Sequence, residues 1–471
     1  MGRILRNWNR LAGWGTEPVD WYSTTSNLMK RRDFLGAGLA AGAGLWITNG
    51  SNVRGRTSEA TPEGETLNVA LIGAGTQGRT LINALGESRG IRVCAVCDIW
   101  PYRLESAQYY LSEISKTEAA GYGDYREMLD KEKSLDCALI ATPDFVHAEQ
   151  TNACLEAGLH VYCEPMMSHT LDGARSMVRT MRKTGKLLQI GLQRRSNPRY
   201  AHVLENLIRQ ADLLGIPVHV STRWNHPEQD DLGWPRRRVL PDDVLKRFGF
   251  SDMHQFRNWR HFKQYSAGDC AHFIATQADV IDWFLGTRPK NILAAGGLDY
   301  YKRREWPDNA TAVMEYATED GALRASSQIL TATSGGPHRI YEHFMGVAGS
   351  IQVAENPDWL KVYHEPRTEE WNEWVRKGFL VKEEQADPDE DPNAIKVRET
   401  GQVVGYLVPI ELEKSVFAYH LENFFNAVRD KAPLSCPADV AFHGQVIGLK
   451  LNEAIAARKM LEFTETEFEV A

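Results

Sequence analysis

Short apolar runs alternate with amphipathic stretches between residues 67 and 191, and this alternation predicts the fold class. Apolar runs as long as buried parallel strands lie at residues 67–72, 92–97, 136–141, 160–163 and 187–191. Apolar positions at helical spacing mark the stretch that ends at residue 85 and the stretches 146–157 and 171–184. Strands that alternate with helices predict an α/β fold with a doubly wound parallel sheet of the Rossmann type.

The first apolar run leads directly into Gly-Ala-Gly-Thr-Gln-Gly at residues 73–78. Gly73 permits a tight turn, Gly75 lets backbone N–H groups reach a pyrophosphate, and Gly78 lets the following helix pack on the strand. The second run ends in Asp98, 20 residues after Gly78, where a carboxylate accepts hydrogen bonds from the ribose of NAD. Because this carboxylate repels a 2'-phosphate, the spacing favours NAD over NADP, although Arg103 lies nearby in the sequence.

Residues 192–471 show a different pattern, in which predicted strands follow one another. A helix is expected over 200–210 and strands over 218–222, 292–296, 311–316, 322–330, 343–346 and 349–353. A long polar and aromatic insertion follows residue 222, an acidic and proline-broken run at 383–391 predicts a mobile loop, and helices are expected over 412–429 and 438–458. We therefore expect a dinucleotide-binding domain at 61–191 and a C-terminal α/β domain for substrate at 192–471.

The first 60 residues differ from the rest of the chain. The basic segment Lys30-Arg31-Arg32-Asp33-Phe34-Leu35 precedes an uncharged run at 36–47, which is typical of a signal peptide and resembles a twin-arginine export signal. Met29 precedes this segment and is the expected natural start, and Ser58-Glu59-Ala60 is a loose cleavage site. The pattern predicts export to the periplasm, with membrane contact only through the signal. A cytoplasmic protein, or one that keeps its leader, is the alternative.

The charge balance argues against a nucleic-acid partner. The chain has 54 Lys and Arg against 62 Asp and Glu, a net charge of -8, whereas phosphate binding favours a basic surface. Residues 61–471 alone carry 46 basic and 58 acidic side chains, so the body of the protein is more acidic than the whole. The seven cysteines, including Cys94 and Cys97 in one apolar run, are expected to be buried thiols, and no histidine spacing predicts a metal site.

Further motifs resemble those of the glucose-fructose oxidoreductase/inositol dehydrogenase (Gfo/Idh/MocA) family. They are the glycine fingerprint through Asp98, Ala141-Thr142-Pro143-Asp144-Phe145-Val146-His147, Val161-Tyr162-Cys163-Glu164, Ile190-Gly191-Leu192-Gln193-Arg194-Arg195, Asp279 to Gly286 and His420-Leu421-Glu422-Asn423-Phe424. The resemblance implies a C-terminal domain with a large open, mainly antiparallel sheet that commonly forms the interface of a homo-oligomer, a dimer or a tetramer. It also implies a nicotinamide cofactor and a sugar, cyclitol or related carbohydrate substrate. The expected cofactor residues are Gly73, Gly75, Thr76, Gln77, Gly78, Asp98, Thr142, Pro143, His147 and Glu164.

The chain departs from this family at its acid/base positions. The family usually has Glu-Lys-Pro after the fifth strand, whereas this chain has Glu164-Pro165-Met166. The family helix Asp-x-Gly-x-His-x-x-Asp aligns with His272, Ile274, Thr276 and Asp279. His272 lies one helical turn before Thr276 and is our main candidate for proton transfer. The other catalytic candidates are Asp279, Asp269 and Tyr265, and the substrate candidates are Arg194, Arg195, Arg260, Thr276 and Trp234.

Three functions remain open from the sequence. The first is an NAD-dependent oxidoreductase that transfers hydride to or from a sugar or sugar derivative with nonstandard acid/base residues. The second is an NAD-using glycosidase or lyase, in which transient oxidation acidifies a neighbouring C–H bond. The third is a dinucleotide-binding protein that has lost turnover.

Overall fold

A computed structural model describes residues 66–115, 118–383 and 404–470. The predicted export signal and the part of the acidic run after residue 383 lie outside these ranges. Among the described helices, none is both long and apolar enough to cross a membrane.

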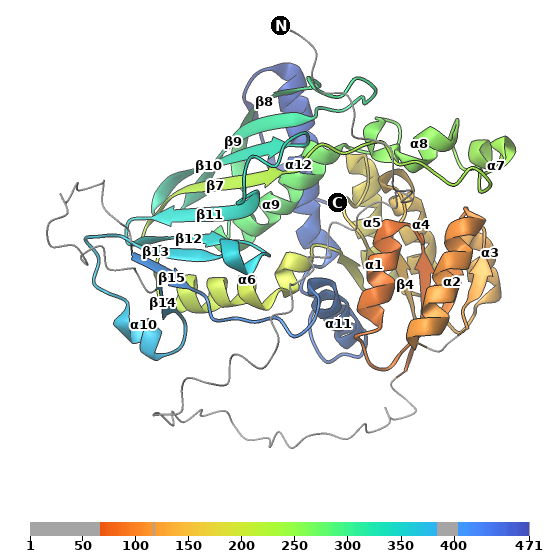
Figure 1. Cartoon of the computed structure of the whole chain (residues 1–471), viewed down its shortest axis with the longest axis horizontal. Coiled ribbons are helices and arrows are strands. Elements are labelled where there is room, and N and C mark those ends of the chain that lie inside the picture. The colour runs from red at the N-terminus through yellow and green to blue at the C-terminus, as the bar shows by residue number, and fades with distance from the viewer. Residues whose placement is uncertain (1–65, 116–117, 384–403, 471) are drawn as a thin grey trace, which may run out of the picture. The chain divides into compact units, whose positions relative to one another are not determined.

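A six-stranded parallel sheet forms the first part of the described chain (Figure 1). Its strand order is β3-β2-β1-β4-β5-β6, the doubly wound order that the apolar runs predict. The strands are β1 Leu67–Ile72, β2 Ile91–Cys97, β3 Ala120–Tyr122, β4 Cys137–Ile140, β5 His160–Cys163 and β6 Leu188–Ile190. The helices are α1 Thr76–Leu85, α2 Pro101–Ser115, α3 Tyr125–Lys131, α4 Asp144–Glu156 and α5 Leu171–Thr184. Four-residue runs such as β4 are buried throughout because helices cover both faces of the sheet.

A ten-stranded mixed sheet forms the second part, in the order β14-β15-β13-β12-β11-β7-β10-β9-β8-β16. Only the β7–β10 pair is parallel among the strand pairs of this sheet in the described residues, so the sheet is mainly antiparallel, as expected. The strands are β7 Pro217–Asn225, β8 Pro289–Gly297, β9 Asn309–Thr318, β10 Gly321–Leu330, β11 Ile340–Gly346, β12 Gly349–Val353, β13 Lys361–His364, β14 Val381–Lys382, β15 Val404–Leu407 and β16 Leu461–Glu462. Alternate residues of these strands are buried, since helices cover one face only.

The second part also contains helices. They are η1 Gln193–Ser196, α6 Pro198–His202, η2 Val203–Gln210, α9 Asp269–Leu285, η4 Pro357–Trp359, α10 Asn372–Arg376, α11 Val416–Val428, α12 Ala438–Ala457 and α13 Glu465–Phe468. Phe284 of α9 stacks on Phe344 of β11, which places α9 on the buried face of the second sheet. Helix α11 returns to the first sheet, where Leu421 joins the apolar cluster of α1, so residues after 192 complete the covering of the first sheet.

The insertion after β7 is more ordered than the polar and aromatic loop expected from the sequence. It contains the short helices α7 Asp242–Arg247, α8 Met253–Arg257 and η3 Trp259–His261. Their apolar side chains pack with Trp100, which follows β2, in a small core of Leu240, Leu245, Phe250, Met253 and Tyr265. The indole N–H of Trp100 also donates to the carbonyl of Arg238 at 2.6 Å. The aromatic residues of the insertion therefore anchor it to the first sheet.

Candidate active site

The glycine turn between β1 and α1 forms a cradle with open space above the helix N-terminus. A Cβ atom on Gly73, which has φ of +95°, would lie 2.6 Å from the carbonyl oxygen of Ala141, and one on Gly78 would lie 2.0 Å from that of Gly73. A Cβ on Gly75 would meet no atom within 4 Å. Gly75 is the N-cap of α1 and no side chain caps the helix there, so the first N–H groups, from Thr76 onward, are available to an anion.

Asp98 lies at the carboxyl end of β2, beside this cradle. Its two carboxylate oxygens accept hydrogen bonds from the backbone N–H groups of Ala74 and Trp100, each at 2.8 Å. Burial raises the pKa of Asp98, whereas these N–H groups and the charge of Arg103 lower it. A carboxylate held at this position fits the ribose of a dinucleotide.

Glu164 follows β5, on the half of the sheet that binds the nicotinamide end of a dinucleotide. Its carboxylate accepts a hydrogen bond from the hydroxyl of Tyr162 at 3.2 Å. Burial raises the pKa of Glu164 to about 7, although hydrogen bonds from Gln77 and Tyr162 and the charge of Arg260 lower it. Gly191 leaves room for this carboxyl group, because a Cβ there would lie 2.9 Å from Oε2 of Glu164.

The loop after β4 carries three predicted cofactor residues. Pro143 is the N-cap residue of α4, and the hydroxyl of Thr142 donates to Oε1 of Gln150 at 2.6 Å. The ring of His147 lies between the carbonyl oxygens of Met166, 2.7 Å from Nδ1, and Thr142, 2.6 Å from Nε2. A neutral imidazole donates through one nitrogen only, so His147 makes one of these two hydrogen bonds, and its ring lies between the loops after β4 and β5.

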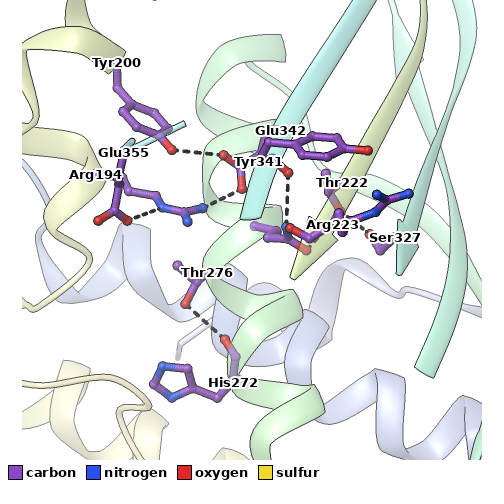
Figure 2. A network of polar contacts seen from close by, with 11 residues as sticks. Arg194, Tyr200, Thr222, Arg223, His272, Thr276, Ser327, Tyr341, Glu342 and Glu355 are labelled. Carbon is purple, nitrogen blue, oxygen red and sulfur yellow. Dashed lines mark hydrogen bonds and ion pairs between the residues drawn. The ribbon is translucent and has the colours of Figure 1, made fainter. Parts of the chain in front are cut away.

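Helix α9 presents two of the predicted residues on one side (Figure 2). The hydroxyl of Thr276 donates to the carbonyl of His272 at 3.0 Å, and Nδ1 of His272 has no hydrogen-bond partner although it is buried. Burial lowers the pKa of His272 to about 3, assisted by the charges of Arg260, His147 and His226. His272 is therefore a neutral imidazole at physiological pH, and its proton affinity is too low for an efficient general base.

The two consecutive arginines after β6 are both held by carboxylates. Arg194 is 1% exposed and binds Glu342 and Glu355, with Tyr200 donating to Glu342 at 3.1 Å (Figure 2). Arg195 donates through Nε to both oxygens of Asp279, at 2.8 and 3.0 Å. We therefore do not assign Arg194 or Arg195 to substrate, nor Asp279 to proton transfer, because each of these charged groups has an oppositely charged partner within the fold.

The remaining predicted site residues have mainly structural contacts. Tyr265, a catalytic candidate from the sequence, instead has a structural position, because its hydroxyl donates to the carbonyl of Gly249 at 2.8 Å and its ring is buried in the core of the insertion. Trp234 packs against the same core. Asp269 begins α9, where a carboxylate interacts favourably with the helix dipole. The charge of Arg260 lowers the pKa of Glu164 and of His272, and its guanidinium lies over the ring of Trp259.

Asp144 and His226 are two polar residues that the sequence reasoning did not single out as site residues. Asp144 is 1% exposed, accepts a hydrogen bond from Ser266 at 3.1 Å through Oδ2, and has no partner for Oδ1. Nε2 of His226 accepts from the indole of Trp224 at 2.8 Å, and its buried Nδ1 has no partner. Asp144 stands in a motif that the sequence displays, but its unpartnered oxygen depends on the distant Ser266.

The described residues contain no candidate metal site. No three His, Cys, Asp or Glu side chains of the described ranges are grouped so that they could hold a metal ion. All seven cysteines lie in those ranges and are free thiols, of which Cys97 is buried and Cys94 half-buried.

Comparison with known proteins identifies the Rossmann domain. Residues 67–192 match the model of an oxidoreductase family with an NAD-binding Rossmann fold, GFO_IDH_MocA. This match agrees with the resemblance of the sequence motifs to the Gfo/Idh/MocA family. The matched domain, which contains the glycine cradle and Asp98, is of the NAD-binding type.

Curated relatives of the chain are named as a glycosyl hydrolase and as a dehydrogenase. A glycosyl hydrolase family 109 protein of Stenotrophomonas maltophilia is 29% identical over 203 residues, which are 42% of each chain. The inositol 2-dehydrogenase of Salmonella typhimurium is 30% identical over 160 residues, 34% of this chain and 46% of that protein. The chain thus matches less than half the length of these curated relatives.

Solved structures extend the likeness in fold to the second sheet. The WlbA dehydrogenase of Chromobacterium violaceum, solved with NADH and UDP-GlcNAcA, has a TM-score of 0.61 at 16% identity and covers 85% of this chain and 97% of its own. The myo-inositol 2-dehydrogenase of Lactobacillus plantarum has a TM-score of 0.59 at 16% identity, over 85% of this chain and all of that one. At such identities the likeness establishes the fold alone.

Proposed function

We propose that the protein is an NAD-dependent oxidoreductase that transfers hydride between the nicotinamide and a CH–OH carbon of a sugar, cyclitol or sugar derivative. The observation that carries this proposal is the position of Glu164, a carboxyl group with a pKa of about 7, on the nicotinamide half of an NAD-binding sheet. Relatives named as inositol and WlbA dehydrogenases support a carbohydrate substrate.

Different residues have different roles in such a reaction. The cradle with Thr76 and Gln77, together with Asp98, holds NAD, which when bound supplies the acceptor for hydride. Oxidation of a CH–OH group also releases the hydroxyl proton. Glu164 takes this proton, because its pKa lies near the working pH, where a general base is most effective. We assign to His272 a hydrogen bond to substrate in place of the proton transfer expected from the sequence, because its pKa is about 3.

The relative named as a glycosyl hydrolase supports one second candidate, an NAD-using glycosidase or lyase. This function uses the same residues, since oxidation of one carbon acidifies the neighbouring C–H bond before the leaving group departs. The two candidates differ in their net chemistry, because only the first leaves reduced cofactor behind. The third candidate is a protein that binds NAD but does not convert a substrate.

One set of assays separates these functions. The purified protein is tested for bound NAD, and free sugars, cyclitols and aryl glycosides are then supplied with added NAD. Formation of NADH, followed by its absorbance, supports the dehydrogenase, whereas release of aglycone without net NADH supports the glycosidase. If both signals are absent while NAD is bound, the proposal of an active enzyme is wrong.

We also propose export to the periplasm and a homo-oligomeric state, a dimer or a tetramer. The basic and paired-arginine segment before residue 36 supports export. Replacing Arg31 and Arg32 by Lys should keep the protein in the cytoplasm in a fractionation experiment, and an unchanged periplasmic fraction would contradict export by this route. Light scattering of the purified protein measures the oligomer, and a monomer at micromolar concentration would contradict the second proposal.

A further inference from the structure

Two arginines lie against the same indole ring, that of Trp100. The guanidinium carbons of Arg257 and Arg103 are 5.1 and 5.9 Å from the centre of this ring. Arg103 belongs to α2, beside the first sheet, whereas Arg257 ends α8 of the insertion. Within the described ranges neither guanidinium forms an ion pair with a carboxylate, and the buried Nε of Arg103 has no hydrogen-bond partner. We call these two residues the arginine pair.

Trp100 fixes the place of the arginine pair in the fold, because it is bound to Asp98. Its backbone N–H donates to Oδ1 of Asp98 at 2.8 Å, and Oδ2 of Asp98 accepts from Ala74 in the glycine turn. Trp100 itself is only 2% exposed. In a doubly wound sheet, the acidic residue that follows the second strand lies beside the adenosine ribose of a dinucleotide. The arginine pair therefore lies at the adenosine end of the candidate cofactor site.

Contacts of the insertion hold Arg257 at this end of the first sheet. The indole N–H of Trp100 donates to the carbonyl of Arg238 at 2.6 Å. Phe256, the neighbour of Arg257, packs its ring edge-on against that of Trp100, with the centres 5.7 Å apart. Nε of Arg257 donates to the carbonyl of Gly233 at 3.1 Å, which fixes the side chain within the insertion. The insertion thus brings a second guanidinium to Trp100, beside that of Arg103.

The positive charge of the arginine pair is only partly compensated. Asp98 supplies one carboxylate beside two guanidinium groups. Burial and the charge of Arg103 lower the pKa of Arg257 to about 10, although the charge of Asp98 counteracts this. Arg238, a third arginine of this region, is paired with Glu105 at 2.9 Å and adds no uncompensated charge. Since the two charges of the arginine pair repel each other, a bound anion would stabilise both.

The chemistry of the guanidinium group restricts which anion fits. Its N–H groups form a planar fork that matches the oxygens of a phosphate. The pyrophosphate of a dinucleotide lies elsewhere, at the N-terminus of α1. At the adenosine ribose a further phosphate exists only in NADP, on the 2'-oxygen, where an arginine near the acidic residue accommodates it. Asp98 repels this phosphate, but two guanidinium charges attract it, so the attraction prevails.

We propose that Arg103 and Arg257 form a binding site for the 2'-phosphate of NADP(H), so that the protein accepts NADP(H) as well as NAD(H). This adds a second cofactor to the proposed oxidoreductase function, but it rests on binding alone and not on turnover. The sequence favoured NAD because it displays Asp98 and Arg103 together, whereas Arg257 reaches Trp100 only through the packing of the insertion.

Binding of the two cofactors tests this site. NADP+ and NAD+ are titrated by calorimetry into the protein freed of cofactor, for the wild type, Arg103→Met and Arg257→Met. Arg237→Met is the matched control, because Arg237 is exposed in the same insertion. We expect the wild type to bind NADP+ at most about tenfold more weakly than NAD+. In each of the two test variants the Kd of NADP+ divided by that of NAD+ should rise at least about fivefold, since a charge-assisted hydrogen bond is lost.

Three results would overturn the inference. The first is a wild type that binds NADP+ more than about tenfold more weakly than NAD+. The second is a ratio that rises less than about fivefold in either test variant, because equal weakening of both cofactors would place the arginine on a part that they share. The third is an equal rise in the control. Binding of NAD+ shows that a variant is folded, and if Arg257→Met binds neither cofactor, Arg257→Gln is judged by the same criterion.

The same measurements separate this inference from the proposed function. If the wild type oxidises no carbohydrate with either cofactor while the ratio responds as expected, the proposed function fails and the phosphate site stands. If the wild type oxidises a carbohydrate with NAD+ but the ratio does not respond in the two variants, the phosphate site fails and the proposed function stands.

Discussion

Glu164→Gln removes one buried ionisable group while keeping its size, and its effect on stability follows from the pKa of that group. The carboxyl titrates at about 7 in the folded protein against an ordinary value of 4.5, because burial disfavours its charged form. Between these two values the folded protein keeps a proton that the unfolded chain has released. The folded state is therefore stabilised less and less as pH rises through this window.

The size of the effect follows from the same shift. Each pKa unit corresponds to about 1.4 kcal/mol, so the wild type loses up to about 3 kcal/mol of stability between about pH 4.5 and about pH 8 on account of Glu164 alone. The amide that replaces the carboxyl group in Glu164→Gln does not titrate and still accepts the hydrogen bond from Tyr162. The variant should resemble the wild type near pH 4.5 and be more stable by up to about 3 kcal/mol near pH 8.

Urea denaturation of the cofactor-free protein from about pH 4.5 to about pH 8.5 measures this difference. Removal of NAD is necessary because a bound ligand adds its own stabilisation. Glu113→Gln is the control, since Glu113 is exposed on α2. If the difference between Glu164→Gln and wild type does not depend on pH, or if the control shows the same dependence, Glu164 does not have a raised pKa and the argument for it as a base at neutral pH fails.

Three further predictions follow from the contacts of the site. Gly75→Ala should weaken NAD binding at least tenfold, as measured by calorimetry, without lowering the melting temperature. Gly78→Ala should lower the melting temperature, because its Cβ would meet a backbone oxygen. Equal melting temperatures for the two variants would contradict these assignments of the two glycines. Arg194→Met leaves Glu342 buried without its positively charged partner, and the free energy of unfolding, measured by denaturation, should fall by about 3–5 kcal/mol. A loss under about 1 kcal/mol would mean that the ion pair is not buried. His272→Ala should raise KM for the substrate more than it lowers kcat, and a kcat loss above a hundredfold at unchanged KM would restore His272 as the proton-transfer group.

The alternation of apolar and polar residues predicted five of the six strands of the first sheet, but it did not predict β3 or the helices α2 and α3. The strands 67–72 and 160–163 and the helix 171–184 have the predicted bounds, because a strand buried on both faces is apolar throughout and an amphipathic helix repeats every 3.6 residues. In the second sheet the predicted strands lie in the right places but are shorter than most of the real ones. Their ends carry polar residues, and cross-strand hydrogen bonds that the sequence does not display extend them.

The sequence by itself predicted the glycine cradle with Asp98 beside it, because the glycines and Asp98 belong to one strand-turn-helix-strand unit and their geometry is local. It did not determine which charged side chains are available for chemistry. Arg194 and Arg195 stand beside the site in the sequence, but Glu342 and Asp279, 148 and 84 residues away, bind them. Arg260 lies almost a hundred residues from Glu164 in the sequence, and its charge nevertheless lowers the pKa of that carboxyl group. Charge pairing and burial depend on distances in space, so only the tertiary structure decided that Glu164 titrates near neutrality.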